Sequence, residues 1–258
     1  MKKLGIIGGL GPMATARFLA LITQMSQAAK DQDHIEILLH SRPGIPDRTA
    51  FITGRSDLNP EADLVTVGKN LADAGAEILA IPCFSAHYFI EAIRVEAKIP
   101  VIDAITETAS CLKEANIKSA GILATDGMIY SHLYQEKLGE AGIKAILPEK
   151  EEQKSIVRLI YDLKGGNAVD LTQFNLISQQ LFSNGADVVL LGCSDLSILK
   201  SDHNLHSGYL DVLEVLARKA VLECGKLRPE YEKLYCFTSN TCQFSSKLET
   251  ANIASETV

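Results

Sequence analysis

The sequence lacks three features that mark common functional classes. No stretch approaches the roughly 18 uninterrupted apolar residues that a membrane-spanning helix requires. Positive charge is not in excess, because 25 Lys and Arg stand against 32 Asp and Glu and give a net charge of −7. The six cysteines show neither CxxC nor disulfide-framework spacing. We therefore expect reduced thiols, a cytoplasmic location, and no nucleic-acid or membrane partner.

The chain does carry enough apolar material for a core. It has 258 residues, of which 47% are hydrophobic and 22% charged, so we expect one large domain or two small ones. Short apolar runs alternate with segments of helical composition, which indicates a mostly parallel sheet with helices on both faces. We expect strands at residues 4–7, 35–39, 78–81, 101–102, 121–123 and 188–191. We expect helices at residues 14–29, 59–74, 85–97, 105–115, 131–141, 151–163, 170–184 and 209–224.

An internal repeat divides the chain into two similar halves. Residues 75–83 match residues 185–193 without a gap, and residues 4–8 resemble residues 120–124 in the same order. The repeat predicts an α/β fold of two pseudo-symmetric domains with the active site in the cleft between them. We assign residues 1–102 plus 205–225 to the first domain and residues 103–204 to the second. Residues 226–258 are expected to form a polar, poorly ordered tail.

Both repeated strands end in a cysteine, Cys83 in the first half and Cys193 in the second. Ligands bind at the carboxyl ends of parallel strands, and a helix N-terminus there favours a thiolate over a thiol. Two opposed thiols suit one reaction well: one thiolate removes a proton from a carbon, and the other thiol returns a proton to the opposite face. Buried cysteines otherwise behave as small hydrophobic side chains, an interpretation that we apply to Cys111, Cys224, Cys236 and Cys242.

Five segments together resemble the aspartate/glutamate racemase family, in particular its aspartate racemases. They are residues 8–15 (GGLGPMAT), 45–49 (IPDRT), 81–87 (IPCFSAH), 121–127 (GILATDG) and 191–193 (LGC). The resemblance covers residues 2–225. It implies a cofactor-independent amino-acid racemase, independent of pyridoxal phosphate and metal, built of two pseudo-symmetric domains and forming a homodimer. The catalytic cysteines of the family map onto Cys83 and Cys193.

The resemblance also implies which residues hold an acidic amino-acid substrate. An arginine and a lysine of the family map onto Arg48 and Lys164, and both suit a dicarboxylic ligand. The other positions implied in substrate binding are Ser85, Thr125, Ser194, Gly11 and Met13. Asp195 is implied as an auxiliary residue that orients nearby groups.

The chain departs from the family pattern beside both cysteines. The family usually has Cys-Asn-Thr at the first cysteine, where the amide and hydroxyl hold the α-carboxylate of the substrate. This chain has Phe84 and Ser85 there, and a phenyl ring cannot form those hydrogen bonds. Ser85 keeps a hydroxyl, and amides at a helix start can still bind a carboxylate. At the second cysteine the usual Thr-Glu is replaced by Ser194 and Asp195, which keep both functional groups.

Several alternatives stay open at this level. His87 lies four residues after Cys83, so on a helix it either tunes the thiol and relays protons or packs as a buried histidine. Zinc spacing is absent. Residues 9–14 fit the G-x-G-x-x-A dinucleotide fingerprint, but the acidic partner is missing and a tight turn explains the glycines equally well. A one-cysteine isomerase or decarboxylase, and a non-catalytic amino-acid-binding protein, remain the other functional hypotheses.

Overall fold

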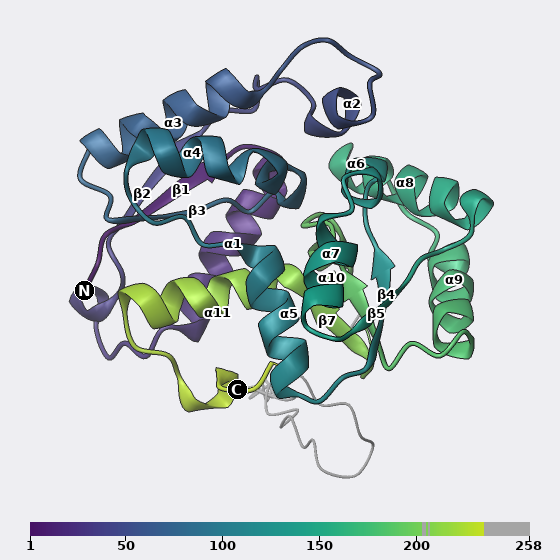
Figure 1. Cartoon of the computed structure of the whole chain (residues 1–258). Coiled ribbons are helices and arrows are strands. Elements are labelled where there is room, and N and C mark those ends of the chain that lie inside the picture. The colour runs from purple at the N-terminus through teal and green to yellow at the C-terminus, as the bar shows by residue number, and fades with distance from the viewer. Residues whose placement is uncertain (203–204, 206, 235–258) are drawn as a thin grey trace, which may run out of the picture.

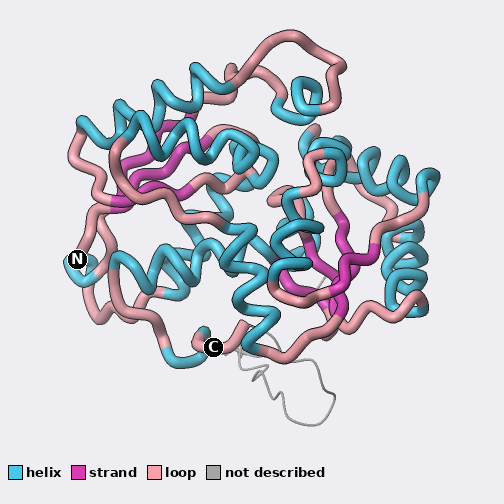
Figure 2. Tube along the Cα trace, in the orientation of Figure 1, coloured by secondary structure: helices cyan, strands magenta, loops and turns pink. Residues whose placement is uncertain are grey.

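The structure, a computed structural model, describes residues 1–202, 205 and 207–234. Its strands are β1 (Leu4–Gly8), β2 (Ile37–Ser41), β3 (Ile78–Ala80), β4 (Ser119–Leu123), β5 (Lys144–Ile146), β6 (Val188–Leu191) and β7 (Tyr209–Asp211). The first three form one parallel sheet in the order β2-β1-β3, and the others form a second parallel sheet in the order β5-β4-β6-β7. The same order recurs in both sheets, which confirms the two pseudo-symmetric α/β halves (Figure 2).

Helices surround both sheets. The α-helices are α1 (Pro12–Met25), α2 (Arg48–Ile52), α3 (Glu61–Asp73), α4 (Ile90–Ala97), α5 (Ala104–Glu114), α6 (Asp126–Tyr130), α7 (Leu133–Glu140), α8 (Lys150–Lys164), α9 (Thr172–Ser183), α10 (Leu196–Asp202) and α11 (Val212–Cys224). Three short 3-10 helices are η1 (Asp31–Asp33), η2 (Phe84–Phe89) and η3 (Pro229–Tyr231). Among the described residues, no helix is both long and apolar enough to cross a lipid bilayer.

Alternate residues of the central strands face different cores, as strand geometry requires. In β1, Leu4 and Ile6 join a core with α1, α5 and α11, whereas Ile7 joins a core beneath α3 and α4. In β6, Leu190 joins the first of these cores and Leu191 joins a third core beneath α8 and α9. The first core is therefore shared by both halves, and α1, α5 and α11 lie between the two sheets (Figure 1).

Several boundaries differ from the prediction. The helix expected at 209–224 begins at Val212, because the Asp211 carboxylate accepts the Leu213 amide hydrogen bond as an N-cap. The three residues before it form β7 and pair with β6, so this part of 205–225, which we assigned to the first domain, is a strand of the second sheet. The helix expected at 131–141 begins at Leu133, because His132, the residue before it, has a left-handed backbone with φ of 58°.

The predicted strand at 101–102 and the predicted tail also need correction. The strand expected at 101–102 is a single bridge between Val101 and Leu79. The start of the expected tail is ordered: the Arg228 Nε donates to the Ser26 carbonyl at 2.9 Å, and η3 follows at Pro229–Tyr231. Residues 235–258, the rest of the expected tail, lie outside the described residues, as do Cys236 and Cys242.

Candidate active site

Each half places one cysteine just beyond its third strand. Cys83 follows β3 and stands directly before η2, whereas Cys193 follows β6 and precedes α10. Cys83 is 5% exposed and Cys193 is 7% exposed. Since both strands are parallel members of equivalent sheets, the thiols lie at the carboxyl ends where the sequence predicts them.

Cys193 is surrounded by charged groups. Its Sγ donates to Asp195 Oδ2 at 3.5 Å, and the same carboxylate oxygen is 3.8 Å from Lys164 Nζ. Burial and the neighbouring Asp195 carboxylate raise the pKa of the Cys193 thiol well above its ordinary value. Burial also raises the pKa of Asp195. This arrangement favours the protonated form of Cys193.

Cys83 has different neighbours. Its Sγ lies 3.5 Å from the Ser85 hydroxyl. The His87 ring is buried, and its Nε2 accepts the Ala104 amide at 3.2 Å, so the ring proton is on Nδ1 and is donated to the Cys83 carbonyl at 3.2 Å. Burial lowers the pKa of His87. His87 is therefore a neutral, packed histidine that links the Cys83 backbone to the start of α5.

Ser197 occupies the matching place four residues after Cys193. Its hydroxyl donates a short hydrogen bond to the Asp211 carboxylate, which caps α11. Both Ser197 and Asp211 are fully buried. The two halves thus tie the segment after each cysteine to the start of a central helix, one through an imidazole and the other through a hydroxyl and a carboxylate.

Lys164 is the last residue of α8, and its pKa depends on nearby groups that include both cysteines. Burial opposes the charge of its ammonium group, but attraction to Cys193, Asp195 and Cys83 outweighs this and raises the pKa of Lys164. Its side chain is 29% exposed. Its ammonium nitrogen lies 3.8 Å from Asp195 Oδ2, the oxygen that accepts from Cys193 Sγ, so Lys164 is linked to Cys193 through this carboxylate.

Arg48, the first residue of α2, is held by backbone carbonyls. Its Nη1 donates to the carbonyls of Ile45 and Pro46 at 3.1 and 3.0 Å, and its Nη2 donates to Leu10 at 3.2 Å. Its buried Nε has no hydrogen-bond partner among the residues that the structure describes. A guanidinium group has five N–H donors, so the Nε hydrogen and one Nη2 hydrogen are left, the number that a bidentate carboxylate contact uses.

Thr125 of the second half contacts Thr49 of the first. It is the N-cap of α6 and is 4% exposed, and its Oγ1 accepts from Thr49 Oγ1 of α2 at 3.3 Å. The backbones approach closely here: a Cβ added at Gly127 would lie 2.9 Å from both the Cα and Oγ1 of Thr49. Our site prediction omits Thr49, although it directly follows Arg48.

Phe84 is part of the hydrophobic core. It is 2% exposed, belongs to the central core shared by both halves, and its ring centroid lies 6.1 Å from that of His87. Ser85 and Ser194, at 9% and 3% exposure, are also buried on either side of the thiols. The aromatic residue that replaces the usual asparagine therefore contributes packing at the start of η2.

A cavity of about 310 Å³ lies between the halves, close to the lower limit for small-molecule sites. The predicted residues that line it are Gly11, Met13, Arg48, Lys164 and Asp195. Asp47 and Tyr161, which the prediction omits, line it too. The predicted residues Cys83, Cys193, Ser85, Thr125, Ser194 and His87 are buried and are not among those that line it.

The glycine-rich turn beside this cavity has a structural explanation. Gly9 has φ of 88°, and a Cβ there would lie 2.5 Å from the Arg42 amide nitrogen. The Gly9 amide donates to the Thr15 hydroxyl, which in turn donates to the Gly11 carbonyl. The close approach of two chain segments thus explains why residue 9 is a glycine, and a nucleotide-binding role is not needed to explain it.

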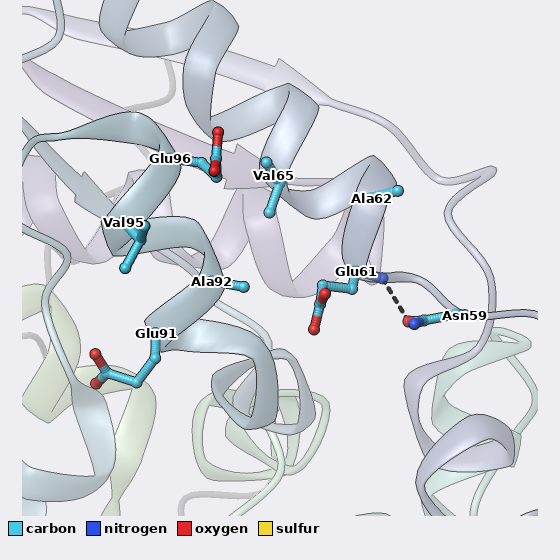
Figure 3. A pocket seen from close by; sticks show the side chains of 8 residues that line it. All are labelled: Asn59, Glu61, Ala62, Val65, Glu91, Ala92, Val95 and Glu96. Carbon is cyan, nitrogen blue, oxygen red and sulfur yellow. Dashed lines mark hydrogen bonds between the residues drawn. The ribbon is translucent and has the colours of Figure 1, made fainter.

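A second hollow, of about 510 Å³, lies on the outer side of the first half (Figure 3). It is formed by α3 and α4 and the turn before α3, and its lining residues are Asn59, Glu61, Ala62, Val65, Glu91, Ala92, Val95 and Glu96. It contains carboxylates but no thiol and no cation. In the described part of the chain, no three His, Cys, Asp or Glu side chains are grouped as metal ligands would be. The cavity between the halves is the candidate active site.

Two α/β halves, each with a parallel sheet, and a cavity lined by residues of both halves are the features that the fold contributes to an assignment. The chain belongs to the Asp/Glu/hydantoin racemase family, whose model matches residues 7–220. The broad-specificity amino-acid racemase RacX of Bacillus subtilis is 26% identical over 227 residues, which cover 84% of this chain and 96% of RacX. The family and this relative support an isomerase that acts on amino acids.

Solved structures agree with this assignment. The aspartate racemase of Picrophilus torridus superposes with a TM-score of 0.80 at 26% identity, covering 92% of this chain and 100% of that chain. A glutamate racemase of Francisella tularensis in complex with D-glutamate gives a TM-score of 0.59 at 18% identity, covering 86% of this chain and 81% of that chain. The second similarity establishes the fold alone.

Proposed function

We propose that this protein interconverts L- and D-aspartate by proton transfer between Cys83 and Cys193, without a cofactor. The observation that carries the proposal is the equivalent position of the two cysteines, each just beyond the third strand of its half, together with Lys164 Nζ at 3.8 Å from the Asp195 carboxylate that accepts from Cys193. Two thiols at equivalent strand ends of opposite halves, with the Lys164 ammonium group lining a cavity of amino-acid size, suit the inversion of a carbon centre. Because of its family, we also propose that the protein is a homodimer and is located in the cytoplasm.

The proposed reaction consumes and returns one proton. The thiolate of one cysteine takes the α-proton, the C–H bond breaks, and its electron pair stays on the α-carbon. The thiol of the other cysteine then gives its proton to the opposite face, so the two thiols exchange protonation states. The ammonium of Lys164 and the remaining N–H groups of Arg48 offset the negative charge that develops on the substrate.

The same geometry suggests how the substrate is held. The buried Nε of Arg48, which lacks a partner, is available to one carboxylate of aspartate. The hydroxyls of Ser85, Thr125 and Ser194 are proposed to bind the other carboxylate and the amino group. Gly11 and Met13 line the cavity and are proposed to limit its size, since Met13 is 65% exposed at its mouth.

The test is proton NMR of L-aspartate in D₂O with reduced protein, comparing wild type with Cys83→Ser and Cys193→Ser. Cys224→Ser is the matched control, because Cys224 is a buried thiol in α11 that does not line the cavity. We expect loss of the α-proton signal and appearance of D-aspartate with wild type and control. Each of the two site variants should lose at least about a hundredfold in rate, as expected when a general acid or base is removed.

Other outcomes would identify other functions. Exchange that persists when one of the two thiols is replaced would indicate one-base chemistry. Binding of aspartate without exchange would indicate an amino-acid-binding protein.

A second candidate is racemisation of amino acids other than aspartate. Two observations favour it: Phe84 replaces a polar residue beside Cys83, and the Asp47 carboxylate lines the cavity and would repel an acidic side chain. The same NMR assay with glutamate and a panel of neutral and basic amino acids distinguishes the two candidates. Faster exchange of a neutral or basic amino acid than of aspartate would favour the second.

A further inference from the structure

Tyr161 connects the two halves at the mouth of the cavity. It lies on α8 of the second half, and its hydroxyl donates to Asp47 Oδ2 at 3.3 Å. Asp47 belongs to the first half, where its other carboxylate oxygen accepts the Ala50 amide and caps α2. Both residues line the cavity, and Tyr161 is 39% exposed. This hydrogen bond therefore spans the cleft at its solvent side.

The Tyr161 ring also contacts the interior of the site. The Lys164 ammonium lies 4.9 Å from the ring centroid, within cation–π range. Lys164 Nζ is 3.8 Å from Asp195 Oδ2, and that oxygen accepts from Cys193 Sγ at 3.5 Å. A continuous series of contacts thus runs from the rim of the cleft at Asp47 to the buried thiol.

The two cysteines are 5% and 7% exposed, so the cleft must open before a substrate can reach them. The short helix α2 lies between β2 and α3 and reaches over to the second half (Figure 1). Two hydrogen bonds hold it there, from Tyr161 to Asp47 and between Thr49 and Thr125. The second is buried, so the first is the one that faces the solvent.

We propose that Tyr161 is a positioning residue that keeps the cleft closed: its hydroxyl holds Asp47 of the opposite half while its ring holds Lys164 in the site. Opening of the cleft then requires loss of the hydroxyl contact. Closure shields Cys83 and Cys193 from water and keeps the Lys164 ammonium beside the Asp195 carboxylate that contacts Cys193. The consequence for turnover rests on the proposed function, whereas the consequence for access to the thiols does not.

The variant Tyr161→Phe removes the hydroxyl and keeps the ring beside Lys164. Asp47→Ser is the second variant, because serine retains a hydroxyl that can cap α2 but is too short to reach the Tyr161 hydroxyl. Tyr88→Phe is the matched control, since Tyr88 is 49% exposed and does not line the cavity. The readout is the alkylation rate of each cysteine, followed by peptide mass spectrometry with iodoacetamide and with a bulkier maleimide.

We expect both variants to speed alkylation of Cys83 and Cys193 by about three- to tenfold, the factor equivalent to a hydrogen bond of about 0.7 to 1.4 kcal/mol. The alkylation rate should rise more with the bulkier maleimide than with iodoacetamide, because a wider opening of the cleft favours the larger reagent. A changed thiol pKa would instead change the rates with both reagents by the same factor. The buried thiols of Cys111 and Cys224 are internal references and should not change. The double variant should show the same alkylation rates as each single variant, because each single substitution already removes the hydrogen bond between residues 161 and 47.

Turnover gives a second readout. Tyr161→Phe should raise the KM for the amino acid by a similar factor with little change in kcat, because the closed complex is less favoured. A residue that only supports folding would lower the active fraction, and thus kcat, at unchanged KM.

Three results would overturn the proposal: unchanged alkylation of Cys83 and Cys193, an equal rise at all four thiols, or the same rise in Tyr88→Phe. Failure of the proposed function looks different. In that case the thiols would still become more accessible, but no amino acid would exchange its α-proton in wild type.

Discussion

The contact between α2 and α6 predicts a measurable cost for a single methyl group. In Gly127→Ala the added Cβ would lie 2.9 Å from the Cα of Thr49, whereas ordinary contacts start at 3.4 Å. A backbone atom cannot rotate away, so the two helices must separate by about 0.5 Å. Overpacking of this kind costs about 1 to 3 kcal/mol, and the better helix propensity of alanine returns up to about 1 kcal/mol. We expect a net loss of about 1 kcal/mol.

The matched control for this prediction is Gly139→Ala in α7, where an added Cβ meets no atom within 4 Å. The same substitution should stabilise the protein there by about 0.5 to 1 kcal/mol. In thermal unfolding followed by circular dichroism, the melting temperature should fall by about 2 to 4 °C for Gly127→Ala and rise for Gly139→Ala. If both variants gain stability, the close approach of the two halves at Thr49 is refuted.

Two further predictions concern the residues around Cys83. Replacing the buried Phe84 by asparagine should cost about 3 to 5 kcal/mol in urea unfolding, as for other large core deletions, and a stable variant with faster aspartate exchange would contradict its assignment to the core. His87 is buried as a neutral ring with a pKa below the ordinary 6.5, so the unfolded chain takes up a proton first as the pH falls. Stability should therefore decrease from pH 6.5 towards pH 5 in wild type but not in His87→Gln, as melting temperatures would show; equal slopes would exclude His87 as the cause.

Much of the fold could be predicted because its strongest signals are local. The apolar strands at residues 4–8 and 188–191 are bounded by glycine and polar residues, and the repeat indicated that the two sheets are related. The elements that the sequence did not reveal are short: β5 and β7 have three residues each, and β7 runs directly into α11. Three residues contain too little of the strand periodicity to be distinguished from the helix that follows.

The candidate site was predictable where residues follow strands and less so where they act across the cleft. Cys83 and Cys193 lie where the strand pattern places them. The contact of Tyr161 with Asp47 joins residues 114 positions apart, and no local pattern indicates such a pair. Arg48 was expected to help hold the substrate. In the structure three of its N–H groups donate to backbone carbonyls, and only the folded chain shows which of its donors remain.

The unequal anchoring of the two cysteines, through His87 in one half and through Ser197 and Asp211 in the other, bears on rates in the two directions. Mirror-image amino acids are equal in free energy in water, so any racemase must reach a one-to-one mixture, and kcat/KM must be the same for both enantiomers. That thermodynamic constraint leaves kcat and KM individually unconstrained. An enzyme whose two halves anchor the segments after their cysteines by different contacts can therefore be saturated at different concentrations of the L and D substrates. The final one-to-one mixture is unchanged.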